Sequence, residues 1–191
     1  LAMKITNRSM VVSAALVLMT GSFNVSAQPF SGHFAGTSFS SADTDINGDL
    51  EGGNRSVVTG NGTFGSSYSA GQGDLLPWDN ASYCDFDETG LPRGLELTYF
   101  ANAGVSTYKN GDQLYTVQST SPPSTLCFNY TDGTSSYEIY RDVVGGSGRF
   151  EGASGTIKLT GSAIPVQQGF SAIKGETTGE INGLAGKGKK E

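Results

Sequence analysis

The sequence contains few of the side chains that most enzymes use for catalysis. Its 191 residues include one histidine, two cysteines and one tryptophan, and only 16% of them are charged. The histidine, His33, is not accompanied by the G-x-S-x-G turn that exposes a catalytic serine, so serine hydrolysis is not indicated. One histidine and two distant cysteines also fall short of the ligand set of a zinc site. The composition therefore excludes the commonest hydrolytic centres.

Long hydrophobic runs are scarce as well, and the longest lies close to the N-terminus. Met10 to Met19 is an almost unbroken apolar stretch after Lys4 and Arg8, and Val25-Ser26-Ala27 supplies the small residues at which a signal peptidase cuts. A stretch of about ten residues is too short to cross a hydrocarbon core of about 30 Å as a helix. We therefore expect residues 1–27 to be a cleaved signal peptide, and the protein to be secreted or periplasmic without membrane insertion.

Basic residues are outnumbered by acidic ones. The chain has 12 lysines and arginines against 18 aspartates and glutamates, which gives a net charge of −6. A nucleic-acid partner requires a basic face, so none is expected. An acidic surface mainly keeps an exported protein soluble.

The remaining chain is expected to form one domain and a short tail. Residues 28–182 are enough to bury a hydrophobic core. Residues 183–191 are rich in glycine and lysine and are expected to be disordered.

Helical periodicity is missing from the mature chain, which instead alternates apolar and polar residues with a period of two. Residues 95–99 and 137–143 show this alternation, which is typical of strands with two different faces. Asn-Gly, Asp-Gly and glycine-rich turns separate such runs. The expected strands lie near residues 31–39, 55–64, 81–87, 93–100, 104–109, 112–120, 125–131, 134–144, 153–163 and 170–181.

Glycine is abundant, with 28 residues, and many of these glycines fall inside the expected strands. Glycines within strands mark bends where a sheet curves enough to close. A closed barrel also leaves no unpaired strand edge, which suits an exported protein. We therefore predict an all-β fold with a single antiparallel, eight-stranded closed barrel rather than a flat sandwich.

Two segments carry a resemblance to a known group of proteins. Tyr140 to Gly155, with the sequence YRDVVGGSGRFEGASG, resembles the glycine turn and following strand of the allene oxide cyclase and dirigent group of β-barrels. Secreted bacterial proteins of unassigned function have similar stretches, and Asn110 to Tyr115 (NGDQLY) resembles a strand-opening segment of theirs. The resemblance implies an eight-stranded barrel with an apolar central cavity, in a dimer or trimer.

The resemblance also implies two kinds of activity, neither of which requires a cofactor. Some members of the group cyclise reactive lipids, and others steer the coupling of bound phenoxy radicals. None of their catalytic residues is carried over to a position here. The glycine turn itself fits a tight barrel corner better than a phosphate cradle, because a strand and not a helix follows it. Arg149, in that turn, is expected to pair with an acid or to rim the cavity mouth.

Cys84 and Cys127 are the two cysteines, and an even number in an exported chain predicts a disulfide between them. The alternative is two buried thiols on separate strands.

Between residues 43 and 51, every second side chain carries oxygen atoms that could bind a metal ion. Their spacing, with Gly48 for the turn, matches the first half of a calcium loop of the EF-hand type, but Asn54 stands where the bidentate glutamate belongs. A calcium site and a plain acidic turn both remain open. The five candidate ligands are Asp43, Asp45, Asn47, Asp49 and Glu51.

The barrel expectation places candidate catalytic residues in the lumen. Glu96, Glu138 and Arg141 lie on expected strands, and a carboxylate buried in an apolar lumen would have a raised pKa suited to acid–base catalysis. In the alternative, both glutamates lie in water because the residues that face inward are Leu95, Leu97, Tyr137 and Ile139. The candidate ligand-binding residues are Trp78, Tyr99, Tyr115, Tyr137 and Tyr140. Trp78, in the apolar segment 75–79, either caps the cavity mouth or belongs to the core.

Three functions are compatible with these features. The first is the binding of a small hydrophobic molecule in the lumen without catalysis, and the second is a cyclase or stereocontrol protein that uses the same cavity. The third is a structural or surface protein stabilised by calcium. An empty apolar lumen favours the first, and glutamate or arginine inside the lumen favours the second.

Overall fold

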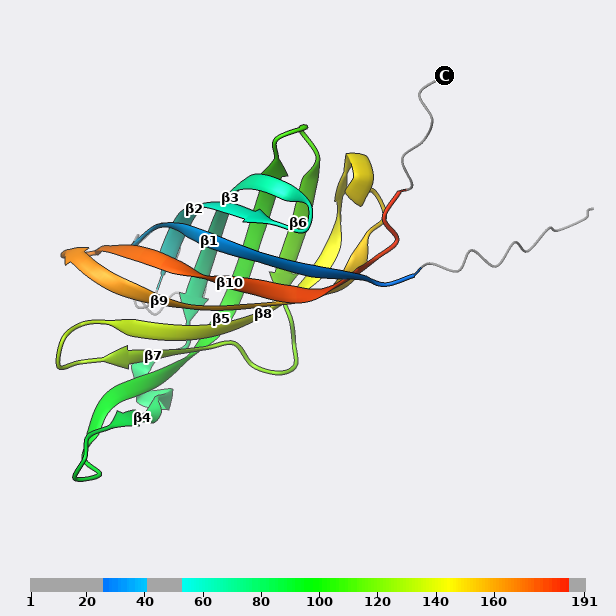
Figure 1. The fold of residues 1–191 in the computed structure, drawn as a ribbon. Coiled ribbons are helices and arrows are strands. Elements are labelled where there is room, and N and C mark those ends of the chain that lie inside the picture. The colour runs from blue at the N-terminus through cyan, green and yellow to red at the C-terminus, as the bar shows by residue number, and fades with distance from the viewer. Residues whose placement is uncertain (1–25, 41–52, 186–191) are drawn as a thin grey trace, which may run out of the picture.

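The computed structural model describes residues 26–40 and 53–185. Two short 3-10 helices, η2 (Trp78–Asn80) and η3 (Gly148–Phe150), interrupt a sheet of ten antiparallel strands (Figure 1). The strands are β1 (Gln28–Ser40), β2 (Asn54–Gly62), β3 (Gly65–Leu75), β4 (Ser82–Phe86), β5 (Pro92–Tyr108), β6 (Gln113–Gln118), β7 (Thr125–Asn129), β8 (Ser135–Ser147), β9 (Ser154–Gln167) and β10 (Phe170–Asn182).

Eight of these strands close into a barrel. Their order is β3-β2-β1-β10-β9-β8-β6-β5, and pairing of β3 with β5 completes the circle. Every pairing is antiparallel, including that of β1 with β10, the first and last strands of the described residues. The predicted fold class, an all-β barrel of eight antiparallel strands, is confirmed.

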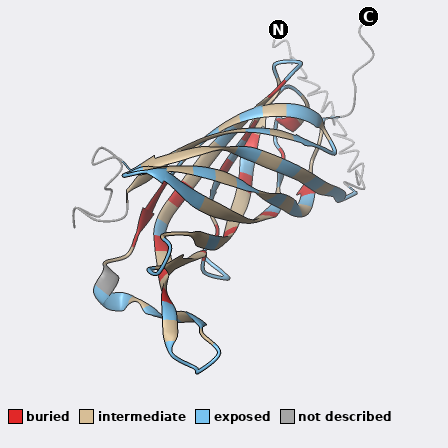
Figure 2. Ribbon diagram, turned by 60° about the vertical axis from the view of Figure 1, so that its left-hand side comes forward, coloured by how far each residue is buried: buried red, intermediate tan, exposed pale blue. Residues whose placement is uncertain are grey.

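The sheet extends beyond the barrel at one end. There the first part of β5 leaves β3 and pairs instead with β4 on one side and β7 on the other. We call residues 82–98 and 125–134 the arm, which contains β4, the start of β5, β7 and two turns. β6 and β7 occupy successive parts of the same gap between β5 and β8. The turns of the arm are largely exposed (Figure 2).

The strand predictions fail in two places. Gly65–Leu75 was not expected to form a strand, because its sequence GSSYSAGQGDL is poor in the β-branched residues that favour strands. It is nevertheless held between β2 and β5, so tertiary pairing outweighs local preference. The second failure is the break expected near residues 101–103, where β5 in fact continues unbroken from Pro92 to Tyr108.

A plug of apolar side chains fills one end of the barrel. Phe150, carried by η3, is fully buried there and contacts the rings of Phe64 and Tyr108 at centroid distances of 5.3 and 5.0 Å. Leu184, in the segment expected to be disordered, packs against the same cluster, and the Ala185 amide donates to the Arg149 carbonyl. The buried members of this cluster are Tyr108, Leu114, Val143, Phe150, Ala153, Ile157 and Ile181.

A second apolar cluster lies toward the arm. It consists of Leu75, Leu97, Tyr99 and Ile139, with Tyr137 and Leu159 packed against it. The part of the barrel between the plug and this cluster contains the candidate site.

Candidate functional site in the barrel lumen

The lumen contains a cavity of about 130 Å³. Its walls differ in the size of the side chains that face inward. On β1, β2 and β3 these residues are mostly glycine and serine, whereas β5, β8 and β9 contribute large side chains. Small residues opposite large ones leave space that neither wall fills. The small-residue wall includes Gly32, Ser56, Gly60, Ser67, Ser69 and Gly71, and the opposite wall includes Tyr99, Tyr137, Ile139 and Leu159.

Arg141 lies among these residues. The alternation of β8 turns Tyr137, Ile139 and Arg141 toward the cavity. The Arg141 Nε group donates a hydrogen bond to Oδ1 of Asn102, which orients the guanidinium. Two glycines make room for it, because a Cβ atom at Gly104 would overlap Nη1 and one at Gly71 would lie 3.4 Å from Nη2.

Burial changes the electrostatics of this arginine. Desolvation lowers the pKa of Arg141 from 12.5 to about 10, and the neighbouring Tyr99 and Tyr137 partly oppose that change. Among the described residues, no carboxylate forms an ion pair with the Arg141 guanidinium. The lumen therefore holds a cation with no acidic partner in the part of the protein that is described.

Two tyrosines line the cavity beside Arg141. Burial raises the pKa of Tyr99 to about 12, with the charge of Arg141 and a hydrogen bond to Asn54 acting in the opposite direction. Burial also raises the pKa of Tyr137, whose hydroxyl donates to the Lys174 carbonyl at 3.3 Å. Both phenols are neutral near pH 7 and already have partners in the barrel wall.

The two candidate glutamates lie elsewhere. Glu138 accepts hydrogen bonds from Lys158 Nζ, at 2.6 Å, and from the Tyr140 hydroxyl, and its side chain is 44% exposed. These two bonds, that of Lys158 first, lower the pKa of Glu138. Glu96 lies in the arm, opposite Ser82 of β4 and Cys127 of β7 in the strand register, and does not line the cavity. The arrangement matches the alternative in which Leu97 and Ile139 face inward.

The other candidate aromatic residues are divided in the same way. Tyr99 and Tyr137 line the cavity, whereas Tyr115 is 37% exposed and donates to Gln113 Oε1 at 2.8 Å on the outer face. Tyr140 also faces outward, where Lys158 lies 5.4 Å from the centre of its ring. The Trp78 side chain lies outside the described part of the structure.

The five candidate calcium ligands, Asp43, Asp45, Asn47, Asp49 and Glu51, lie outside the described residues as well. Within residues 26–40 and 53–185, no three histidine, cysteine or acidic side chains come together as a metal site. No helix in the same ranges is long and apolar enough to span a membrane.

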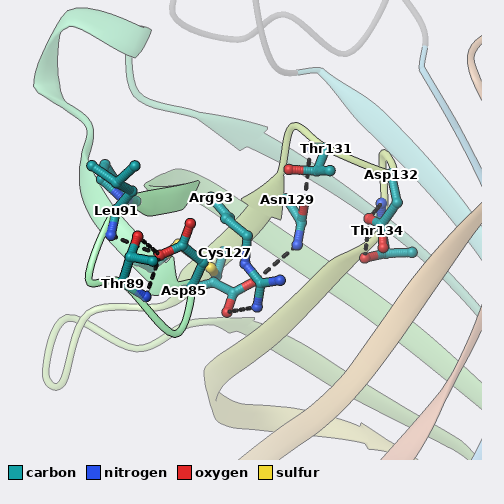
Figure 3. Close-up of polar contacts among 12 residues, drawn as sticks. Asp85, Thr89, Leu91, Arg93, Cys127, Asn129, Thr131, Asp132 and Thr134 are labelled. Atoms are coloured by element: carbon teal, nitrogen blue, oxygen red, sulfur yellow. Dashed lines mark hydrogen bonds and ion pairs between the residues drawn. A yellow bond between two sulfur atoms is a disulfide. The ribbon is translucent and has the colours of Figure 1, made fainter.

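The predicted disulfide is present in the arm. Cys84 of β4 and Cys127 of β7 are bonded across the start of β5, with their Cα atoms 6.0 Å apart. Polar contacts surround it (Figure 3). Asp85 accepts a hydrogen bond from Asn129 Nδ2 at 2.8 Å and lies 3.5 Å from Arg93 Nη2. The arm is thus cross-linked by one covalent bond and several polar contacts.

The glycine turn stabilises the plugged end of the barrel. Arg149 Nε forms an ion pair with Asp112 Oδ2 at 2.8 Å, which confirms one of the two expected roles. The same guanidinium lies 5.2–5.4 Å from the ring centres of Phe64, Tyr108 and Phe150. Arg149 therefore has an acidic partner and aromatic neighbours within the fold, and in this it differs from Arg141.

Sequence reasoning missed three residues of the lumen: Asn102, Gly71 and Gly104. Asn102 falls in the segment where a break in the strand was expected, and Gly71 in the strand that was not predicted. The alternation along β5 could have placed Gly104 on the inward face of the strand. No local signal shows that the absence of a side chain at Gly104 makes room for Arg141.

Comparison with known proteins adds one structural neighbour. No protein-family model matches the chain, and no curated protein sequence matches it. Among solved structures it is similar to a pterocarpan synthase dirigent protein, with 10% sequence identity over 86% of this chain and 89% of that chain and a TM-score of 0.30. A similarity of this size carries no argument about function.

Proposed function

We propose that the protein binds a small hydrophobic molecule in the barrel lumen without catalysing a reaction. The observation that carries this proposal is the cavity itself, whose small-residue wall leaves space opposite Ile139 and Leu159. Apolar walls drive the entry of apolar molecules because binding removes both surfaces from water. The cavity of about 130 Å³ is smaller than the pockets of drug-sized ligands, which are roughly 300–1,000 Å³. A single ring or a short chain fits.

The chemistry of the lining supports binding more than acid–base catalysis. A general acid or base works best with a pKa near the operating pH. The pKa of Tyr99 is raised to about 12 and that of Arg141 lowered only to about 10, so neither group exchanges protons readily at pH 7. These side chains can position a molecule and donate hydrogen bonds to it.

Arg141 favours a second candidate function, that of a stereocontrol protein. Such a protein only orients reactive molecules, so it needs fixed donors and a shaped cavity rather than a titrating base. Glutamate or arginine inside the lumen was the feature expected to favour this activity. Its test is product chirality when phenoxy radicals couple in the presence of the protein, and a racemic product would exclude it.

Blocking the lumen tests the binding proposal. Val58 lines the cavity, whereas Thr59, the next residue of β2, is exposed on the outer face. Val58→Phe should abolish the binding of toluene and phenol, monitored as shifts in two-dimensional NMR spectra, and Thr59→Phe should leave it intact. Circular dichroism shows whether both variants fold. Absence of binding to the unmodified protein across a set of single-ring compounds would exclude the proposal.

Two further properties are part of the proposal. The disulfide supports an exported location, because such bonds persist mainly in oxidising compartments. Calcium binding by residues 43–51 stays a prediction, and calorimetric titration should give heat that disappears in Asp45→Ala.

A further inference from the structure

We propose that the ligand of the lumen carries a carboxylate, and that Arg141 binds this group inside the barrel. The inference rests on the proposed function, because it names the chemical class of the molecule that occupies the same cavity. It would distinguish this barrel from one that holds a purely apolar molecule.

The hydrogen bonds of Arg141 are the first argument. The Nε group donates to Asn102, but among the described residues neither Nη1 nor Nη2 donates to a protein acceptor. A guanidinium has five N–H donors in a planar fork, which matches the two oxygens of a carboxylate. Asn102 thus fixes the orientation of a group whose outer donors have no acceptor in the described part of the chain.

The cost of burying a charge is the second argument. A cation removed from water destabilises a protein unless an anion or several hydrogen bonds compensate. Arg149, at the plugged end, has such compensation from Asp112 and three aromatic rings. Among the described residues, Arg141 has only Asn102 and the two neutral phenols beside it. A ligand that brings its own negative charge would complete the pair.

The neighbouring residues are the third argument. The hydroxyl groups of Tyr99 and Tyr137 already bond to Asn54 and to the Lys174 carbonyl, so they compete little for the ligand's oxygens. Gly71 and Gly104 leave the space that the guanidinium occupies. Ile139 and Leu159 would contact the ligand's apolar body. The class is therefore a carboxylic acid with one ring or a short aliphatic chain.

Benzoate and nitrobenzene provide a matched pair of probes, because they have nearly the same shape and only benzoate is charged. We expect isothermal titration of the full chain to show benzoate binding at least tenfold more tightly than nitrobenzene. Arg141→Gln should lower the affinity for benzoate at least tenfold and leave that for nitrobenzene unchanged. The control variant Lys158→Gln removes a cation from the outer face and should alter neither affinity.

The possible outcomes separate the two proposals. If neither probe binds to any variant that folds, the proposed function fails and this inference fails with it. If nitrobenzene binds as tightly as benzoate, or if Arg141→Gln weakens both equally, the lumen binds small molecules but Arg141 is not the anchor.

A measurement without ligand tests the same idea. Because no carboxylate of the described residues pairs with Arg141, replacing it by an apolar side chain of similar length should stabilise the empty protein. We expect Arg141→Met to raise the melting temperature by a few degrees, and saturating benzoate to raise that of the unmodified protein but not of Arg141→Met. A fall in the melting temperature of the empty variant would show that Arg141 stabilises the fold, which would overturn the inference.

Discussion

The barrel and the arm belong to one continuous sheet but are stabilised by different means. The barrel is closed by eight strands and filled at its plugged end by side chains such as Phe150 and Leu114, which are almost completely buried. The arm exposes large apolar side chains, among them Tyr83, Phe86 and Leu91, and is cross-linked by a disulfide. A segment with little core needs a covalent or polar constraint, and a closed barrel does not.

The barrel also contains two arginines in different environments. Arg149 pairs with Asp112 and stabilises the plug, whereas Arg141 lies beside a cavity and, within residues 26–40 and 53–185, donates a hydrogen bond only through Nε. Stability and binding capacity are therefore concentrated in neighbouring parts of the same lumen. The arm contributes Leu97 to the second apolar cluster, but none of its residues lines the cavity.

The largest expected effect concerns the plug. Phe150→Ala should lower the free energy of unfolding by about 4 kcal/mol, because it removes a fully buried ring and leaves a cavity. Phe86→Ala in the arm is the matched control, since that ring is 53% exposed, and should cost less than about 1 kcal/mol. Denaturant unfolding measures both. Equal losses would contradict the distinction between barrel and arm.

Removal of the disulfide should have the next largest effect. The bond joins residues 43 positions apart, and closing such a loop stabilises by up to about 4 kcal/mol in the chain-entropy model. In Cys84→Ser/Cys127→Ser we expect hydrogen exchange to accelerate most in β4 and β7, while benzoate binding in the lumen persists. Loss of binding would show that the arm shapes the cavity.

Alkaline titration tests the difference between barrel and arm, because the barrel contains buried tyrosines. Burial raises the pKa of Tyr99 and of Tyr108 from 10 to about 12. Between pH 10 and 12 the unfolded chain releases protons that the native state retains, so stability should fall as the pH rises. Arg141 has the opposite sign, because its pKa is lowered to about 10 and the native state loses its proton first.

Ultraviolet difference spectra of tyrosinate formation provide the measurement. We expect a late step near pH 12 that becomes smaller in Tyr108→Phe and persists in the arm variant Tyr83→Phe. A single step near pH 10 for all eight tyrosines would contradict the burial of Tyr99 and Tyr108.

The smallest effect is expected in a turn of the arm. Asp87 accepts hydrogen bonds from the Thr89 hydroxyl and from the Thr89 and Leu91 amides, and the Thr89 side chain is the main cause of its lowered pKa. That contribution to stability is present above the ordinary pKa near 3.8 and is lost as the pH falls through the lowered value. Asp87→Asn should increase exchange of the Leu91 amide without altering the barrel, and Glu88→Gln is the control. Equal exchange in the two variants would contradict the role of Asp87.

Parts of the candidate site could be predicted from the sequence. Alternation along residues 137–143 places Tyr137 and Arg141 on one face of a strand, and the structure turns that face inward. Alternation alone does not say which face is inside, so Glu138 and Arg141 were both candidates. Packing resolves the choice, because Ile139 belongs to the core and Glu138 pairs with Lys158 on the outer face.

Composition and local pattern by themselves determined the all-β class and indicated the turns, because strand alternation and Asn-Gly dipeptides act over short distances. They also left a single possible partner for each cysteine, but only the structure shows that the bond forms. Only the tertiary structure decided that Gly65–Leu75 is a strand, that β5 leaves the barrel for the arm, and that two glycines accommodate Arg141. These features depend on contacts between residues far apart in the chain. The role of a glycine such as Gly104 can be recognised only when the side chain packed against it is known.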